Sequence, residues 1–286
     1  MKGQTRPVGA LRSEAGAVRS ELSTLASRLE TLRRRMEQLS ALRDEERDVA
    51  ARVAELERVL DFTRVAAHVR SAARESPLVA EPVPHLIVSN LLPADAYRAV
   101  MHAIPASVLL DGRAERGQEV RVPPRLAPTT AIITWTFLNE VGRVLSDVLV
   151  ERLAEPLAAH ARRRFPSLPP ADGWGVEITL SEARIVRRIP GYQGGSPADR
   201  PWDLLTGVLY LGRHQDTAEY GSRLHGAAIP FRANSLLACA GAADIHAYAS
   251  IPRDAPADTE RYSYEFGIGP TKDARRTLTA LMKSAT

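Results

Sequence analysis

The chain has 286 residues, of which 44% are hydrophobic and 25% charged, so it is long enough for a large core plus an appendage. Its formal net charge is only +4, and its basic and acidic residues are interleaved, which argues against nucleic acid as a partner. The single cysteine, Cys239, excludes an intrachain disulfide and a Cys-rich zinc site. Neither the first residues nor any later stretch has the apolar run of a signal peptide or a membrane-spanning helix, so we expect a cytoplasmic protein without a membrane partner.

The first predicted element is a long helix from about Leu11 to Arg74, where Gly and Pro are almost absent. Its apolar residues recur in alternating steps of four and three, which places them on one narrow seam: Val18, Leu22, Leu25, Leu29, Leu32, Met36 and Leu39. Charged residues flank the seam. We expect a coiled coil that forms a homo-oligomer or docks on a partner protein; the alternatives are a helix folded back on its own domain and a solvated helix.

A proline-rich segment ends this helix. Pro77, Pro82 and Pro84, which follow Ser76, remove backbone donors and disfavour the α conformation of the residues before them. The sequence therefore predicts two parts: an N-terminal helical coiled-coil segment at 1–76 and a second domain at 77–286.

The second domain is predicted to begin with helices and to continue as a β unit, which makes it an α+β domain. A strand at His85–Ser89 and a helix from Leu92 to Ile104 precede an irregular loop at 111–128 and an amphipathic helix from about Ala131 to Ala161. Short apolar runs, separated by Gly, Pro and Asp clusters, then predict strands at Ala183–Ile189, Leu204–Leu211, Ser235–Ala240 and Tyr262–Ile268.

Three residues of the β unit are candidates for chemistry: Asp199 before a strand, His246 on a later strand and Arg261 on the last. A carboxylate and imidazoles on one face can hold Fe(II) with open positions, and a nearby basic side chain can bind a carboxylate. Each residue also has a purely structural explanation. Asp199 can cap a turn, His246 can be a core histidine, and Arg261 can pair with an acid, namely Glu260, Glu265 or Asp258.

Several short stretches carry a resemblance to a known family. They are Pro84 to Pro93 (PHLIVSNLLP), Ile189 to Tyr192 (IPGY), Leu205 to Leu211 (LTGVLYL), Tyr220 to Leu224 (YGSRL), Asn234 to Leu237 and the closing Arg261-Tyr262-Ser263. In this order they resemble the Fe(II)- and 2-oxoglutarate-dependent oxygenase superfamily, in particular its prolyl-4-hydroxylase-like branch. The resemblance spans Pro84 to Pro270 and implies a jelly roll, or double-stranded β-helix, with flanking helices.

The resemblance also implies site residues. Asp199 would be the carboxylate ligand of Fe(II) and His246 the distal imidazole, while Arg261, Ser263 and Tyr192 would bind 2-oxoglutarate. Where the family has a first histidine, two residues before the acid, this chain has Pro197, which cannot bind a metal.

Two other stretches contain histidines that could be considered for the missing ligand. His225 is a candidate replacement if it faces the cavity. His214 and Asp216 form a His-x-Asp pair, but they follow a strand in a loop where the family has a variable turn, and we interpret that pair as a decoy.

Two functions therefore follow as expectations. The first is a 2-oxoglutarate-dependent hydroxylase with an altered metal site, acting on a small molecule, a carrier-bound group or a protein side chain. The second is a catalytically inactive jelly-roll binding or scaffold protein assembled by its coiled coil. Arg261-Tyr262-Ser263 favours the first, and Pro197 favours the second.

Overall fold

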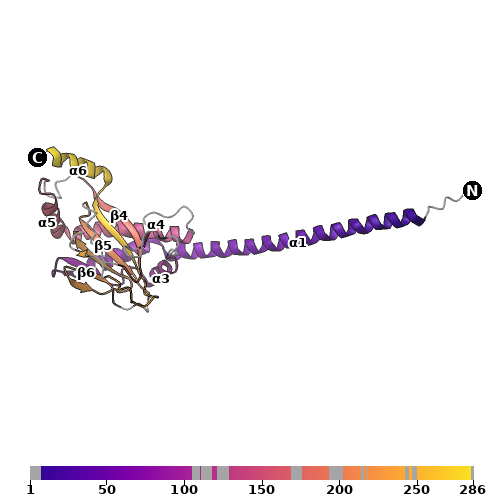
Figure 1. The fold of residues 1–286 in the computed structure, drawn as a ribbon. Helices are drawn as coiled ribbons and strands as arrows, with labels where there is room; N and C mark the ends of the chain where they lie inside the picture. The colour runs from indigo at the N-terminus through magenta and orange to yellow at the C-terminus, as the bar shows by residue number, and fades with distance from the viewer. Residues whose placement is uncertain are drawn as a thin grey trace, which may run out of the picture. The chain divides into compact units, whose positions relative to one another are not determined.

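The chain forms two compact units, Met1–Glu55 and Leu56–Thr286. The structure, a computed structural model, describes residues 8–104, 110, 118–120, 129–168, 176–192, 202–213, 216, 218–241, 245–246 and 250–284. The first unit contains most of helix α1 (Val8–Val59), and all other elements belong to the second (Figure 1). The division predicted between 76 and 77 lies inside the second unit, between α2 (Phe62–Glu75) and β1 (Leu78–Val79).

The single helix predicted from about residue 11 to 74 is interrupted at residues 60 and 61. Asp61 restarts it as α2, because its carboxylate accepts hydrogen bonds from the backbone N–H groups of Thr63 at 3.0 Å and Arg64 at 3.5 Å. The apolar face of α2 is buried in the core of the second unit. In contrast, every side chain of α1 from 21 to 40 is exposed. The structure thus confirms a helix in this region, and the coiled coil stays a prediction.

In the described ranges, ten strands form two antiparallel sheets. The large sheet has the order β1-β2-β8-β5-β10-β4-β3, and the small sheet has the order β7-β6-β9. After β1, the large-sheet strands are β2 (His85–Val88), β3 (Gln118–Val120), β4 (Ile178–Arg188), β5 (Leu205–Leu211), β8 (Ser235–Ala240) and β10 (Arg261–Pro270). The small-sheet strands are β6 (Ser222–Leu224), β7 (Ala227–Ile229) and β9 (Ile245–His246). From β5 onward the chain alternates between the large and the small sheet, which is compatible with a jelly roll.

Helix α4 (Thr129–Arg152) covers one face of the large sheet, where it packs on both β4 and β10 (Figure 1). Helix α5 (Ala154–Arg164) contacts β8, α6 (Lys272–Ser284) contacts the end of β10 that it follows, and α3 (Ala94–His102) contributes to the same core as α4. The helix predicted from 131 to 161 is two helices, because Leu153 leaves the helical conformation. Helix α6 had no counterpart in the sequence analysis. No helix in the described ranges is both long and apolar enough to cross a membrane.

The large sheet, in which β10 is an interior strand, separates two cores. The β10 residues Tyr262, Tyr264, Phe266 and Ile268 belong to the large core shared with the helices. The opposite face of the large sheet contributes Val208, Tyr210, Leu237 and Cys239 to a smaller core, which also contains Leu224, Ile229 and Phe231 from the small-sheet region. We call this second side of the large sheet the inner face.

Candidate functional site

The inner face of β10 carries polar residues at every second position, beginning with Arg261, Ser263 and Glu265. In the antiparallel register with β4, Arg261 lies opposite Arg188 and Glu265 lies opposite Arg184. Directly opposed residues of an antiparallel pair project to the same side of a sheet. The register therefore gathers three arginines, one glutamate and one serine on the inner face.

The Glu265 carboxylate is the centre of a closed network. One oxygen, Oε1, accepts hydrogen bonds from Arg188 Nη2 and from Ser263 Oγ, the latter at 3.0 Å. The other, Oε2, accepts from Arg184 Nε at 3.0 Å and lies 2.9 Å from Arg184 Nη2. Glu265 and Arg188 are each 2% exposed. We call these four residues the Glu265 cluster; in it one buried carboxylate binds two guanidinium groups.

Two tyrosines border the Glu265 cluster. The ring centroid of Tyr192, in the turn after β4, lies 5.4 Å from Arg188 Cζ, a cation–π distance. On β5, the Tyr210 hydroxyl donates to Ser222 Oγ at 2.7 Å and so connects the large sheet to the small one. Burial raises the pKa of Tyr210 to about 12, against the opposing effects of the Ser222 hydrogen bond and the Arg188 charge.

Arg261 lies at the start of β10, and only 4% of it is exposed. Its Nε donates to the Glu219 carbonyl at 3.3 Å, its Nη1 donates to the Glu260 carbonyl at 3.0 Å, and Nη1 lies 3.5 Å from Asp216 Oδ1. The guanidinium also lies over two rings, with Cζ 5.0 Å from the Phe231 centroid and 5.8 Å from that of Tyr220. This cation is therefore buried and has a carboxylate, that of Asp216, beside it.

The acid that pairs with Arg261 differs from the alternatives raised by its sequence. The carboxylate beside Arg261 is that of Asp216, a residue that the sequence brought to attention only as part of the His-x-Asp pair with His214. Glu260 contributes only its backbone carbonyl to Arg261, since its side chain binds Arg187 and Arg213. Glu265 binds Arg184 and Arg188 instead.

The structure brings together the residues expected to bind 2-oxoglutarate. Arg261 and Ser263 share the inner face of β10. Tyr192 contacts Arg188, which binds the same Glu265 carboxylate as Ser263 does. The hydroxyl of Thr206, on β5 opposite Gly267, is buried and has no hydrogen-bond partner among the described residues. The inner face thus offers a buried cation and hydroxyl groups.

The expected metal ligands are mostly outside the described part of the chain. Asp199, Pro197 and His214 lie outside the described residues. The backbone of His246 lies in β9, opposite Arg223 of β6, and its side chain is not among those described. Within the described ranges, no group of three or more His, Cys, Asp and Glu side chains could hold a metal ion. The metal site therefore stays a prediction.

His225, the candidate replacement ligand, is exposed, with a φ of 48°, in the two-residue turn that joins β6 to β7. Because the side chains of Asp199 and His246 lie outside the described part of the chain, the role of His225 as a ligand stays a prediction.

The Glu265 cluster was missed by the sequence analysis, which considered Glu265 only as a partner for Arg261. A signal was present. From 261 to 268 the sequence RYSYEFGI alternates strictly between polar or small residues and large apolar ones, and Arg184 and Arg188 stand at even spacing on β4. Such a period of two places the polar residues on one face.

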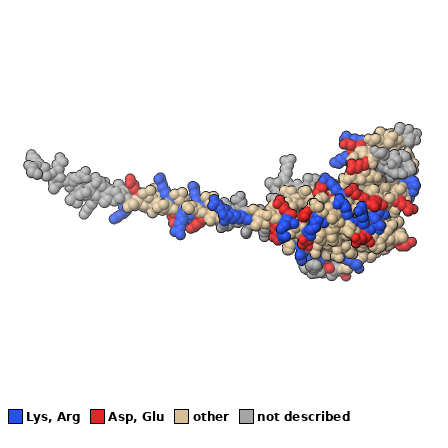
Figure 2. Space-filling model, turned by 180° about the vertical axis from the view of Figure 1, so that it is seen from behind, with Lys and Arg blue, Asp and Glu red and all other residues tan. Residues whose placement is uncertain are grey.

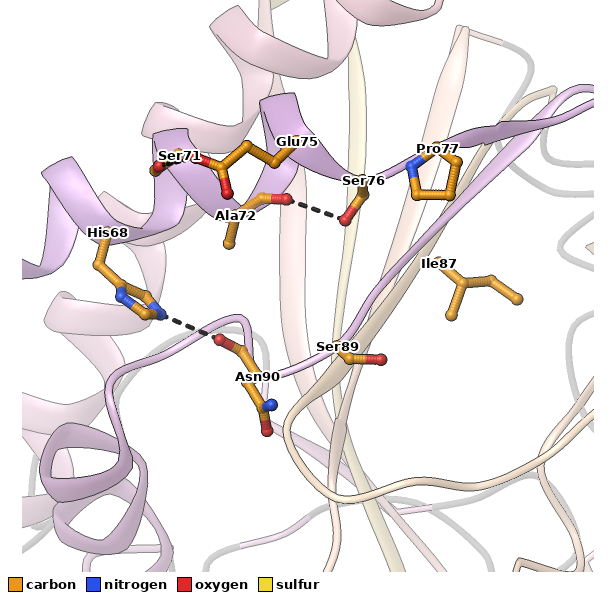
Figure 3. A pocket seen from close by; sticks show the side chains of 9 residues that line it. All are labelled: His68, Ser71, Ala72, Glu75, Ser76, Pro77, Ile87, Ser89 and Asn90. Carbon is orange, nitrogen blue, oxygen red and sulfur yellow. Dashed lines mark hydrogen bonds between the residues drawn. The ribbon is translucent and has the colours of Figure 1, made fainter.

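A separate groove lies between α2 and β2 (Figure 3). It has a volume of about 540 Å³ and is lined by His68, Ser71, Ala72, Glu75, Ser76, Pro77, Ile87, Ser89 and Asn90. Its polar side chains bind neighbours at the rim: His68 Nε2 lies 3.0 Å from the Asn90 carbonyl, Ser71 donates to Glu75, and Ser76 Oγ donates to the Ala72 carbonyl at 2.9 Å. The groove is open and has no buried charge, so the inner face is the stronger candidate.

The fold is similar to those of several solved structures. An oxidoreductase of the 2OG-Fe(II) oxygenase family from Burkholderia pseudomallei matches 71% of this chain and 89% of its own, with 16% identity and a TM-score of 0.37. HygX from Streptomyces hygroscopicus, with nickel and 2-oxoglutarate bound, matches 65% of this chain and 82% of its own, with 12% identity and a TM-score of 0.35. IDO from Bacillus thuringiensis matches 71% of this chain and 95% of its own, with 9% identity and a TM-score of 0.38.

No family model matches the chain, and no curated protein matches it. At TM-scores below 0.5 the structural similarities do not decide which residues bind a metal or a cosubstrate.

Proposed function

We propose that the second unit is an Fe(II)- and 2-oxoglutarate-dependent oxygenase of the prolyl-4-hydroxylase-like kind, which hydroxylates a small molecule, a carrier-bound group or a protein side chain. The observation that carries the proposal is the position of Arg261 and Ser263. Both lie on the inner face of the central strand β10, 4% and 0% exposed, respectively. A buried guanidinium two residues from a hydroxyl suits the terminal carboxylate of a dicarboxylate such as 2-oxoglutarate.

The residues fit the cosubstrate better than they fit the metal. Arg261 is held by two backbone carbonyls and two aromatic rings, so its guanidinium is positioned before any ligand arrives. A carboxylate of 2-oxoglutarate would replace Asp216, which now lies 3.5 Å from Nη1. Asp199 and His246 would hold Fe(II), which when bound supplies the oxidising chemistry. Tyr192, 5% exposed, shields this end of the inner face from water.

One observation favours the second candidate, a catalytically inactive jelly-roll binding or scaffold protein assembled by its N-terminal helix. Glu265 is an internal carboxylate that already binds Arg184, Arg188 and the Ser263 hydroxyl. Unless Ser263 exchanges this partner for a ligand, Arg261 alone must bind the cosubstrate.

Anaerobic titration with Co(II) or Mn(II), with and without 2-oxoglutarate, separates the two candidates. For the enzyme we expect metal binding that 2-oxoglutarate strengthens. Replacement of Arg261 by Met should weaken 2-oxoglutarate binding by about 30-fold or more, because a buried charge pair is lost. His246→Ala should abolish metal binding. Two exposed residues provide matched controls that should bind as wild type does: Arg276→Met, whose side chain is 86% exposed, for Arg261→Met, and His102→Ala for His246→Ala.

Circular dichroism of each variant checks that the fold is intact. Absence of any metal binding that depends on 2-oxoglutarate, together with wild-type behaviour of His246→Ala, would exclude the oxygenase and leave the scaffold.

A further inference from the structure

The described part of α1 carries an apolar seam without a partner. Its members are Leu22, Leu25, Leu29, Leu32, Met36 and Leu39, and they are 52% to 71% exposed. Their spacing corresponds to positions a and d of a heptad, with Leu22 at position a. A seam of six large apolar side chains gains stability only when another helix covers it.

The residues at the flanks of the seam determine which helix can cover it. In this register the g positions are Glu21, Arg28 and Arg35, and the e positions are Arg19, Ala26, Arg33 and Ser40. The acids Glu30 and Glu37 fall at b, away from the seam. Between residues 26 and 40 the flanks therefore contain arginines and no acid.

Ion pairs within α1 do not neutralise both flanks. Arg33 Nε lies 3.2 Å from Glu37 Oε1, and Arg34 Nε, on the outer face, lies 3.6 Å from Glu30 Oε1. Arg28 and Arg35 form no ion pair with any described residue. Figure 2 shows Lys and Arg side chains spaced along the described part of this helix. The g flank thus presents two uncompensated positive charges.

A second copy of the chain is a poor occupant of this seam. In a parallel pair, a g residue faces the e residue of the next heptad, so Arg28 would face Arg33 of the second copy, twice. In an antiparallel pair centred on the seam, g faces g, so Arg28 would face Arg35 of the second copy, also twice. Like charges across a helix pair select against that pairing.

We propose that the seam docks on an acidic helix of another protein, with apolar residues at its a and d positions and Asp or Glu at e and g. Such a helix would bury the six apolar side chains and pair with Arg28 and Arg35. A membrane surface is less suitable, because helices that lie in a membrane interface have a broad apolar face, and here the apolar residues form only a narrow seam. This proposal does not depend on the activity of the second unit.

The test uses the full chain and two fluorescent helical peptides of about four heptads, both with Leu at a and d. One carries Glu at every e and g position, the other Lys. We expect the acidic peptide to bind at least about tenfold more tightly in fluorescence anisotropy and to weaken as salt rises from about 0.05 to 0.5 M. The double variant R28E/R35E should reverse the preference, and R34E, on the outer face, should leave it unchanged.

Three outcomes would overturn the proposal. One is equal affinity for the two peptides. Another is a dimeric mass in light scattering for the chain alone that R28E/R35E leaves unchanged, which would make a second copy the occupant. The third is binding to phosphatidylserine vesicles without binding to the acidic peptide. Because the side chains at 28, 34 and 35 are exposed, these variants should fold, and far-UV circular dichroism verifies it.

Discussion

The two faces of β10 are both buried, but one carries apolar side chains and the other polar and charged ones. On the side of the helices, Tyr264 and Phe266 are fully buried, and Trp135 of α4 meets the Tyr264 ring edge-on at a centroid distance of 6.4 Å. On the inner side, Ser263 and Glu265 are equally buried but are held by hydrogen bonds and ion pairs. Equal burial therefore does not mean equal contribution: the apolar face supplies stability, and the polar face is retained at an energetic cost.

The largest expected effect comes from the apolar face. Phe266→Ala removes a fully buried ring and should lower the free energy of unfolding by about 3–5 kcal/mol. Chemical denaturation followed by circular dichroism measures it. Leu281→Ala on α6, where the leucine is 45% exposed, serves as the control. A loss of less than about 1 kcal/mol for Phe266→Ala would contradict the assignment of stability to this face.

Substitution of Glu265 should lower the free energy of unfolding by less than Phe266→Ala does, and the loss should depend on whether Arg188 is present. Glu265→Gln removes the negative charge that Arg184 and Arg188 bind and should cost about 2–3 kcal/mol. Adding Arg188→Met should restore part of that loss, since the unpaired charge is removed with it. Urea unfolding of both single variants and the double variant gives the coupling energy, and strict additivity would show that the cluster does not act as a unit.

The smallest effect is expected at Tyr210, where the inner face meets the small sheet. Tyr210→Phe deletes the hydrogen bond to Ser222 and should cost about 1 kcal/mol near pH 7. Because burial raises the folded-state pKa of Tyr210 to about 12, its contribution is fully present below the unfolded-state pKa and is lost as pH rises through the folded-state value.

The pH dependence of stability checks the Tyr210 prediction. Wild type should lose stability as pH rises above about 10, the usual pKa of tyrosine, and Tyr210→Phe should lose about 2 kcal/mol less over the same range. The pKa values of Tyr97 and Tyr264 are also raised by burial, so these residues should cause part of the loss of stability at high pH in both wild type and Tyr210→Phe. Identical slopes would contradict a buried, neutral Tyr210.

The strands were predictable because their signal is local. The apolar runs at 204–211, 235–240 and 262–268 correspond to β5, β8 and β10 within one or two residues. The interruption at Asp61 was not predictable, because Gly and Pro are almost absent from this part of the sequence and only the capping contacts of Asp61 and the burial of α2 mark the end of the first helix. Periodicity does not report tertiary burial.

The candidate site was predictable to a lesser extent. The closing Arg261 and Ser263 could be placed on one face from their spacing of two. Their partners could not, because Arg188 and Glu265 are 77 positions apart in sequence, and only the β4–β10 register brings them together. Asp216 and Arg261 likewise meet through the fold.

Gly207 of β5 lies opposite Phe266 in the register of the large sheet, and a Cβ atom at 207 would overlap the phenyl ring. Strand pairing in a sheet can slip by one residue, which exchanges its two faces. Here a slip would place the ring against Thr206 or Val208 and turn the Glu265 carboxylate toward the helices. The register in which Phe266 packs against Gly207 is therefore also the one that keeps the charges on the inner face.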